Sequence, residues 1–236
     1  MKEILRLPSA IIAIVIVFAV HPKAVASFTF NPNLAIPDNS TVGVADTRII
    51  AGQNGLITSV TLSLQLTGTP ASSNAFNGDF YAYLQHDSGF AVLLNRTGRT
   101  AVNGFGYGDS GFHVTFDDSA ANGDIHQYRN VTNPGGGALT GIWQPDGRAT
   151  NPNSVLATDA RVAMLDSFQG LDPNGAWTLF VADVSPIGTA VLQGWTLNFE
   201  VAPIPEPGTI GFGVALLGAS LLASARTSRR RRAPLN

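Results

Sequence analysis

The sequence predicts an all-β domain, a jelly-roll β-sandwich, and three observations support that class. Short segments alternate apolar and polar residues with the period of a half-buried strand. Turn-forming residues, mainly Gly, Asn, Asp and Pro, separate these segments. Between residues 27 and 203, no window of about 11 residues carries a convincing helical stripe. Short strands joined by turns, without helices, are typical of β-sandwiches.

The clearest strand signal lies at 56–67, where apolar residues at every second position alternate with Thr, Ser and Gln. The Asn- and Pro-rich segment before it predicts a lead-in, with an edge strand at most around 36–38. Shorter alternating segments predict strands at 80–84, 90–94 and 112–116. The stretch 120–160 has little periodicity, and Ile142-Trp143 within it is expected to anchor a strand or a loop packed on the core.

The stretch 165–200 is the part around which the domain is expected to fold. It holds two Trp-Thr-Leu units, which begin at Trp177 and Trp195, and apolar residues fall at every second position of both. Both tryptophans are in phase with the core side of their strands, so we expect them to be buried. The polar loop between them makes the two strands either a hairpin or a pair that crosses between sheets.

The N-terminus predicts a signal peptide at residues 1–26. Lys2 and Arg6 precede an apolar run at 10–20, and Ala24 and Ala26 form an A-x-A site for signal peptidase. We therefore expect cleavage after Ala26. An N-terminal membrane anchor is the alternative, but the apolar run is short for that role.

The C-terminus predicts a transmembrane helix at 209–225, a stretch of 17 residues without a charge. As a helix it reaches roughly 26 Å, enough for a thin bilayer. A basic tail at 226–232 follows with five arginines, which predicts a cytoplasmic location for that end.

The charge of the central domain, residues 27–203, restricts its partners. Six arginines stand against fourteen carboxylates, a formal charge of −8, and the domain has no lysine. An acidic surface of this kind argues against binding to nucleic acid. The chain also has no cysteine, which excludes disulfides, thiol catalysis and thiolate metal sites.

A run of residues in one order resembles the P domain (P/Homo B), which follows the catalytic domain of proprotein convertases and many bacterial subtilases. The residues that carry the resemblance are Gly78, Asp79, Phe80, Leu84, Gly89, Gly108, Asp109, Phe112, Phe116, Asp117, Asp118, Ala120, Gly141, Ile142, Trp143, Gln144, Pro145, Leu165, Phe168, Gly170, Asp172, Gly175, Trp177, Leu179, Val181, Asp183, Gly188, Leu192, Trp195 and Leu197. The resemblance spans about 36–199 and implies a jelly-roll β-sandwich of the galactose-binding-domain-like kind. Leu66-Thr67-Gly68 occupies the stretch where the family usually has a histidine. Ile187 stands where it usually has a second acid, which argues against a calcium-type site in that loop.

The tail makes a second resemblance. Pro205-Glu206-Pro207, the apolar span and the arginine cluster together resemble a PEP-CTERM sorting signal, here residues 204–236. Such a signal implies that an exosortase cuts or transfers the exported protein near the Pro-Glu-Pro. It also implies a Gram-negative bacterium and a destination in the envelope, at the cell surface or in the extracellular polysaccharide matrix.

Residues 108–111, Gly-Asp-Ser-Gly, are the candidate for a nucleophilic serine, and we expect them not to be catalytic. A triad needs a histidine base and an orienting acid, and the candidates in trypsin order, His86 and Asp87, are neighbours in one turn. The P-domain resemblance explains the same residues as a loop entering a strand. We expect no enzymatic activity, and a serine-endopeptidase function would belong to the protease that usually accompanies a P domain.

Four carboxylates, Asp109, Asp117, Asp118 and Asp183, are the candidate ligands of a calcium ion, with Asp79 as a further candidate. Calcium takes several oxygen ligands, but no Asp-x-Asp-x-Asp-Gly loop is present. The alternative is that Asp117 caps a turn and Asp118 is solvated. Calcium is compatible with the sequence, and no cofactor is required.

Aromatic residues supply the candidate carbohydrate contacts. The three tryptophans with Tyr81 and Tyr83 suit a sugar-stacking face, but burial is expected for Trp177 and Trp195, which leaves Trp143 as the candidate ligand contact. The histidines show no metal-ligand spacing, and we expect ordinary surface or loop positions for them: His86, His113 and His126.

Three hypotheses of function follow. The first is an exported, envelope-anchored, non-catalytic module that binds or builds the cell surface or exopolysaccharide matrix. The second is an accessory module linked to an exported subtilisin-like serine protease. The third is a calcium-dependent carbohydrate-binding module.

Overall fold

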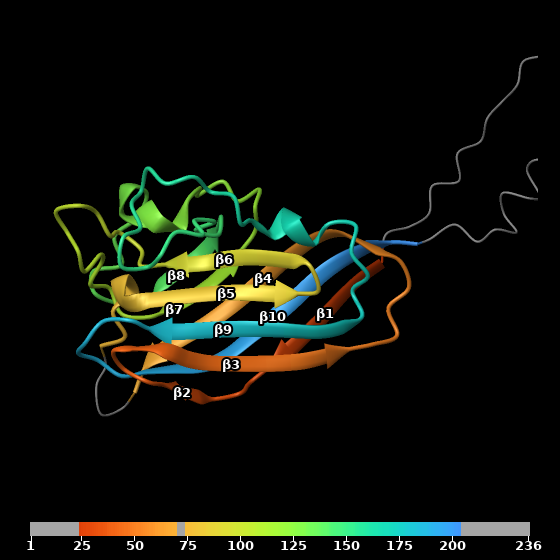
Figure 1. Cartoon of the computed structure of the whole chain (residues 1–236), viewed down its shortest axis with the longest axis horizontal. Helices are drawn as coiled ribbons and strands as arrows, with labels where there is room; N and C mark the ends of the chain where they lie inside the picture. The colour runs from red at the N-terminus through yellow and green to blue at the C-terminus, as the bar shows by residue number, and fades with distance from the viewer. Residues whose placement is uncertain (1–23, 70–73, 204–236) are drawn as a thin grey trace, which may run out of the picture.

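The computed structural model of the protein describes residues 24–69 and 74–203 and shows a sandwich of two β-sheets (Figure 1). In order of hydrogen-bonded neighbours, the six-stranded sheet runs β1-β10-β4-β7-β8, with β2 also on β10, and the four-stranded sheet runs β3-β9-β5-β6. The strands are β1 (Ala24–Phe30), β2 (Leu34–Ile36), β3 (Ser40–Ile50), β4 (Leu56–Gly68), β5 (Phe80–His86), β6 (Gly89–Asn95), β7 (Phe112–Phe116), β8 (Leu139–Trp143), β9 (Gly175–Asp183) and β10 (Ala190–Ala202). Three short 3-10 helices lie between described strands: η1 (Asn77–Asp79), η2 (Ile125–Asn130) and η3 (Leu165–Phe168).

The predicted two-sheet β-sandwich is confirmed, and the strands expected in the middle of the chain form as β4, β5, β6 and β7. Trp143 ends β8, which runs parallel to β7. The edge strand expected around 36–38 forms slightly earlier as β2, whereas β1 and β3 form where only a lead-in was expected. In β3 the buried position 46 is an aspartate, so the sequence of this strand lacks the apolar alternation that marks the others.

The two tryptophan strands cross between the sheets, since β9 belongs to the four-stranded sheet and β10 to the six-stranded one. Both indoles are buried, as predicted, with exposed fractions of 0% for Trp177 and 2% for Trp195. The Nε1 of Trp195 donates a hydrogen bond of 2.7 Å to Oδ2 of Asp46 on β3. This bond joins the two sheets through the core and gives the buried carboxylate a donor.

The segment between β8 and η3 covers the free edge of β6. Val92 N–H donates to the carbonyl of Ala163 at 2.9 Å, and Gly147 N–H donates to the carbonyl of Val92 at 2.8 Å. Asp146 N–H donates to the carbonyl of Leu93 at 3.0 Å. The aperiodic stretch therefore protects an edge strand, whose backbone would otherwise be open to pairing with another chain.

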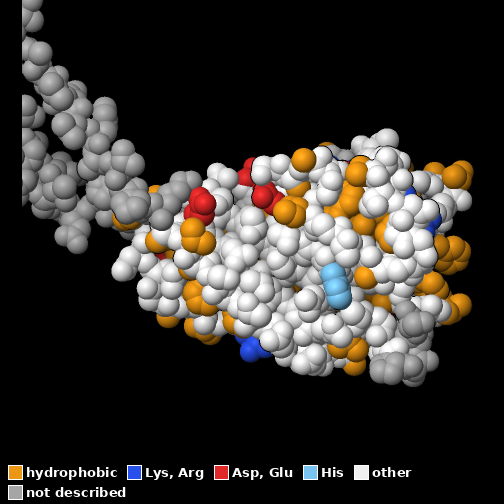
Figure 2. Space-filling model, turned by 180° about the vertical axis from the view of Figure 1, so that it is seen from behind, with side chains coloured by type: hydrophobic (Ala, Val, Ile, Leu, Met, Phe, Trp, Pro, Cys, Tyr) orange, Lys and Arg blue, Asp and Glu red, His pale blue; other side chains and the backbone are white. Residues whose placement is uncertain are grey.

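The outer face of the six-stranded sheet is lined by hydroxyl side chains. Ser63 on β4 bonds Thr115 on β7 at 2.8 Å between hydroxyl oxygens, and Thr29 on β1 bonds Thr196 on β10 at 3.0 Å. Figure 2 shows this side of the molecule, where white, uncharged surface prevails. Such a face is the ordinary solvated side of an antiparallel sheet.

Replacing Trp195 by Phe should lower the free energy of unfolding by about 1–3 kcal/mol, because the buried Asp46 carboxylate loses its indole donor. Urea unfolding measures the loss. In an Asp46→Ala background the same replacement should cost less, and the double-mutant cycle isolates that coupling. Equal costs in the two backgrounds would show that the bond does not stabilise the sandwich.

Candidate functional site

The four-stranded sheet carries aromatic side chains on its outer face, where the other sheet carries hydroxyls. We call Tyr81 and Tyr83 of β5, Phe90 of β6 and Phe180 of β9 the aromatic face. Strand alternation directs them outward, because the residues on both sides of each one are buried. All four are themselves half-buried, so part of each side chain is in contact with solvent.

The rings of the aromatic face contact one another. Tyr83 stacks on Phe180 with ring centroids 4.8 Å apart and planes 16° apart, which follows from the register that pairs these two residues. Phe90 lies 5.2 Å from Tyr83. Tyr81 lies 6.0 Å from Tyr83 and 6.4 Å from Phe180, but its plane is turned by 59° and 63° from theirs. The face therefore consists of a nearly parallel central pair with a third ring turned across one end.

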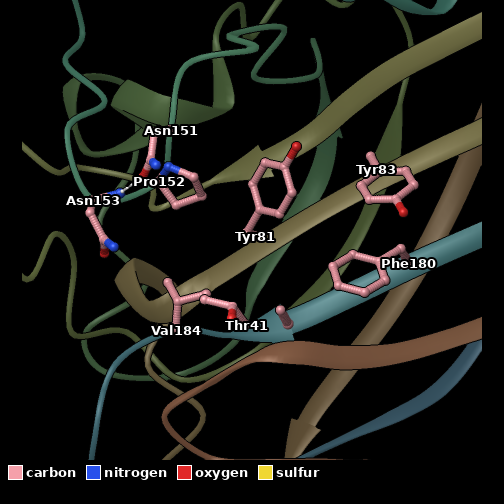
Figure 3. A pocket seen from close by; sticks show the side chains of 9 residues that line it. Thr41, Tyr81, Tyr83, Asn151, Pro152, Asn153, Phe180 and Val184 are labelled. Atoms are coloured by element: carbon pink, nitrogen blue, oxygen red, sulfur yellow. Dashed lines mark hydrogen bonds between the residues drawn. The ribbon is translucent and has the colours of Figure 1, made fainter.

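A pocket of about 300 Å³ opens along this face (Figure 3). The residues that line it are Thr41, Tyr81, Tyr83, Asn151, Pro152, Asn153, Phe180, Ala182 and Val184. None of these lining residues is an Asp, Glu, Lys, Arg or His. We call Asn151-Pro152-Asn153 the asparagine wall; Figure 3 shows it beside Tyr81, on the side away from Tyr83 and Phe180.

The asparagine wall is held in place by side chains beneath it. Nδ2 of Asn95 donates to the backbone carbonyls of Arg148 and Thr150 at 2.9 and 2.8 Å. Nη2 of Arg99 donates to the backbone carbonyl of Asn153 at 2.5 Å. These bonds hold the backbone, so the side-chain amide of Asn153 remains at the exposed rim of the pocket.

A buried charge network lies under the segment that carries the wall. Arg148 pairs with Asp124 at 2.6 Å and with Asp146 at 3.2 Å. Nδ1 of His126 lies 2.8 Å from Oδ2 of Asp146, and its Nε2 lies 3.1 Å from the carbonyl of Arg99. Both partners are acceptors, so the ring satisfies them only when both nitrogens carry a proton. Burial alone would lower the pKa of His126, but the hydrogen bond and charge of Asp146 outweigh it and raise that pKa.

The expected surface or loop positions of two histidines were wrong. His126 is fully buried, and His86 stacks on Trp177 with ring centroids 4.1 Å apart. The ring nitrogens of His86 lie 2.9 and 2.7 Å from the carbonyls of Ala176 and Asp172. A single histidine carries no periodicity from which its burial could be predicted. His113 is exposed, as expected.

The pocket presents neutral polar groups beside its rings. Burial raises the pKa of Tyr81, and the neighbouring Tyr83 and Asp146 raise it further, so this phenol stays protonated at neutral pH. A protonated phenol donates and accepts hydrogen bonds, as a side-chain amide does. Rings that offer an apolar face, with hydroxyls and amides at the edge, suit a ligand with apolar faces and a polar rim.

The structure does not bring the four predicted calcium ligands together. Asp109 is buried and accepts hydrogen bonds from the hydroxyl of Tyr128 at 2.6 Å and Nε of Arg129 at 2.8 Å. Asp117 accepts from the backbone N–H and the hydroxyl of Ser119, which confirms the alternative that it caps a turn.

The other two predicted ligands also serve local structure. Asp118 is not simply solvated: it accepts the backbone N–H groups of Leu165 and Asp166 at 3.1 and 2.7 Å and so caps η3 from a distant part of the chain. Asp183 is buried and accepts from the backbone N–H of Ser185 at 3.3 Å. In the described ranges, no group of three or more His, Cys, Asp or Glu side chains is placed to hold a metal ion.

Asp183 and Asp79 form a buried acidic pair beside a single cation. Nη2 of Arg96 lies 3.9 Å from Oδ1 of Asp79. Burial raises the pKa of Asp79 to about 6 and that of Asp183 to about 7, and the charge of Asp79 contributes to the rise at Asp183. One guanidinium does not compensate two buried carboxylates, so both carry pKa values well above the ordinary range of an aspartate.

Trp143, the predicted ligand contact, is largely withdrawn from solvent. Its exposed fraction is 1%, its Nε1 donates to the carbonyl of Thr140 at 2.8 Å, and its ring packs edge-on to Tyr128. It anchors β8 on the core beside β7, as expected for a strand at Ile142-Trp143. It also lines a second pocket of about 260 Å³, and ligand contact there stays a prediction.

Residues 108–111 do not form a catalytic triad with His86. The hydroxyl of Ser110 accepts the backbone N–H of Ala75 at 2.9 Å, and Ser110 bridges to Phe76 just before the start of β5. His86 ends β5, on the order of 20 Å from the start of that strand.

The predicted sorting elements lie at the edge of the described residues or outside them. Ala24 and Ala26, the predicted cleavage-site residues, belong to β1 and pair with β10. Pro205-Glu206-Pro207, the span 209–225 and the tail 226–232 lie outside the described residues. In the part of the chain that the structure describes, no helix is long and apolar enough to cross a membrane. Cleavage and sorting stay predictions.

Sequence reasoning included Tyr81 and Tyr83 among the candidate sugar contacts but missed Phe90, Phe180 and the asparagine wall. The sequence does mark Phe180 as unusual: it is an aromatic residue at an outward-facing position of a strand whose inward-facing positions are apolar. The sequence of the asparagine wall does not distinguish it, since Asn-Pro-Asn has the composition of an ordinary turn.

Replacing Asp183 by Asn should reduce the pH dependence of stability. The folded pKa values of about 6 and 7 lie above the ordinary aspartate value of 3.8. The folded state therefore binds more protons than the unfolded chain across that interval, and stability falls as the pH rises through it. At about 1.4 kcal/mol per pKa unit, the wild type should lose roughly 3 kcal/mol relative to the variant between about pH 5 and pH 8.

Urea unfolding of both proteins at the two pH values measures this difference. Asp87→Asn, a change to an exposed carboxylate in the β5–β6 turn, is the matched control and should run parallel to the wild type. A parallel profile for Asp183→Asn as well would contradict the role of the acidic pair.

No protein-family model matches the chain, and no curated protein matches it. Among solved structures, the chain is similar to one chain of the crystal structure of the Aeromonas sobria serine protease (ASP) and the chaperone (ORF2) complex, with 14% sequence identity and a TM-score of 0.44. The match covers 78% of this chain and 28% of the other, so the chain spans under a third of the length of the protein it matches. Similarity at this level assigns no function.

Proposed function

We propose that the protein is a non-catalytic module that binds carbohydrate through its aromatic face. The observation that carries this proposal is the pocket formed by Tyr81, Tyr83 and Phe180 and bordered by the asparagine wall. The aromatic rings of the pocket suit the apolar C–H faces of a sugar ring, and its neutral polar rim suits the hydroxyls at the edge of that ring.

The aromatic face has no evident role in holding the sandwich together. Aromatic side chains stabilise a fold by leaving water, at about 25 cal/mol per Å² of apolar surface, and these four are only partly withdrawn from it. The outer face of the other sheet shows that hydroxyl residues suffice at such positions. A contiguous exposed apolar cluster of this kind marks an interaction site.

The shape and charge of the pocket favour a carbohydrate over other ligands. A volume of about 300 Å³ is at the lower end of the range for small-molecule pockets, about 300–1,000 Å³, and suits a few sugar rings. The formal charge of −8 between residues 27 and 203 disfavours nucleic acid. The lining residues include no carboxylate, so we expect binding that does not need calcium, in contrast to a calcium-dependent module.

The proposal places this binding outside the cell. A signal peptide cut after Ala26 by signal peptidase and a PEP-CTERM segment at 204–236 handled by an exosortase would deliver the domain to a Gram-negative envelope. Its ligand there would be a surface or matrix exopolysaccharide. The finer assignment to a jelly roll of the P-domain kind is part of this proposal and rests on the sequence resemblance over 36–199.

An accessory role beside an exported subtilisin-like protease is the second candidate function. The P-domain resemblance favours it, and the loop end of the sandwich offers a surface for it. There Phe105 and Ile187 are exposed to 72% and 71% and border an apolar pocket of about 350 Å³. Phe105→Ser with Ile187→Ser should then abolish co-purification with the partner protease, and unchanged co-purification would exclude this surface.

Phe180→Ala and Tyr83→Ala should each weaken carbohydrate binding by about tenfold or more, because truncating an aromatic anchor costs about 2 kcal/mol at a binding site. Affinity electrophoresis in gels that contain dissolved polysaccharides measures the change. EDTA should leave the retention unchanged.

Phe105→Ala is the matched control, since Phe105 is an exposed aromatic residue that does not line the pocket. Thermal melts of all variants verify that they fold. Equal retention of the two aromatic-face variants and the wild type would rule out this site.

A further inference from the structure

We propose that the aromatic face takes a single, uncharged polysaccharide chain that twists along its length. A charged polysaccharide and the flat surface of a crystalline one are thereby excluded as ligands. This inference rests on the proposed function and narrows it to one chemical class of ligand.

The absence of an available cation at the pocket argues for an uncharged ligand. A uronic acid needs a cationic partner for its carboxylate, and the lining residues named above include none. Two guanidiniums that bond the segment around the asparagine wall are committed to structure: Arg148 pairs with Asp124 and Asp146, and both terminal nitrogens of Arg99 donate to backbone carbonyls.

The angles between the rings argue for a twisted chain. A crystalline polysaccharide presents a flat surface and needs rings in one plane. Tyr83 and Phe180 are within 16° of each other, but Tyr81 is turned by 59° from the first and 63° from the second. One sugar residue stacked on the open side of Tyr83 or Phe180 and a neighbour stacked on Tyr81 would have different orientations. Only a chain that is free to twist between its residues presents both faces.

The asparagine wall argues against a flat surface in a second way. It stands beside Tyr81 and borders the pocket on that side, as Figure 3 shows. Arg99 bonds the carbonyl of Asn153, Asn95 bonds the segment that leads into the wall, and Oδ1 of Asn151 accepts the N–H of Asn153 at 2.9 Å. A fixed border of this kind narrows the access of a flat surface to Tyr81, whereas a single chain would fit between the wall and the rings. The amide of Asn153 is then placed to bond the hydroxyls of the sugar on Tyr81.

The full chain, tested against three classes of polysaccharide, decides the inference. The neutral soluble class is β-glucan, xylan and galactomannan, and the acidic class is polygalacturonate and alginate, all in affinity gels. The crystalline class is microcrystalline cellulose and chitin, in sedimentation assays. We expect retention by at least one neutral soluble polysaccharide, with no change between low and high salt, and no binding to the other two classes.

Two variants test the placement of the chain. Tyr81→Ala and Asn153→Ala should each reduce affinity for the neutral polysaccharide at least about fivefold, while Phe105→Ala should leave it unchanged. Binding to an acidic or crystalline polysaccharide alone would overturn this inference and leave carbohydrate binding in place. Binding to no polysaccharide would overturn the proposed function as well. Full affinity in both variants would show that the chain does not reach Tyr81 and the wall.

Discussion

The register of β5 against β9 determines both the core and the outer face of the four-stranded sheet. Leu84 lies opposite Leu179 in the core, and Tyr83 lies opposite Phe180 on the outside. Because side chains alternate with a period of two, a slip of one residue would bury the tyrosines and expose the leucines. Packing of the hydrophobic core therefore fixes the register that places Tyr83 opposite Phe180, and no further interaction is needed to bring these two rings together.

The arginines of the domain are committed to structure. Arg96, Arg129 and Arg148 pair with buried or half-buried carboxylates, and Arg99 bonds backbone carbonyls. Buried ion pairs are costly to assemble and costlier to break by removing one partner, so they specify one arrangement of the irregular segments around them. In a chain without cysteine, this is how aperiodic loops are fixed over β6. Because the arginines are bound to these structural partners, no guanidinium lines the pocket of this acidic domain.

The alternation of apolar and polar residues made most of the strands predictable, because a half-buried strand needs an apolar residue at every second position. It failed at β3, where Asp46 occupies a core position and accepts hydrogen bonds from Trp195, 149 residues away, and from Arg48. The candidate site was partly visible, since Tyr81 and Tyr83 stand out of phase with their buried neighbours. Trp143 anchors a strand on the core, as expected, but the sequence does not show that β7 is the strand beside it. The asparagine wall depends on long-range bonds from Asn95 and Arg99, and a single sequence does not show such pairings.

The first and last described strands, β1 and β10, are antiparallel neighbours, and Ala24 lies opposite Val201. The two ends of the sandwich therefore leave it side by side (Figure 1). In the chain before cleavage after Ala26, tension applied between those ends would open β1 from β10 one residue pair at a time, instead of shearing all their hydrogen bonds at once. β1 is thus the part of the sandwich that yields first under load. The four-stranded sheet, which carries the aromatic face, lies outside that line of force.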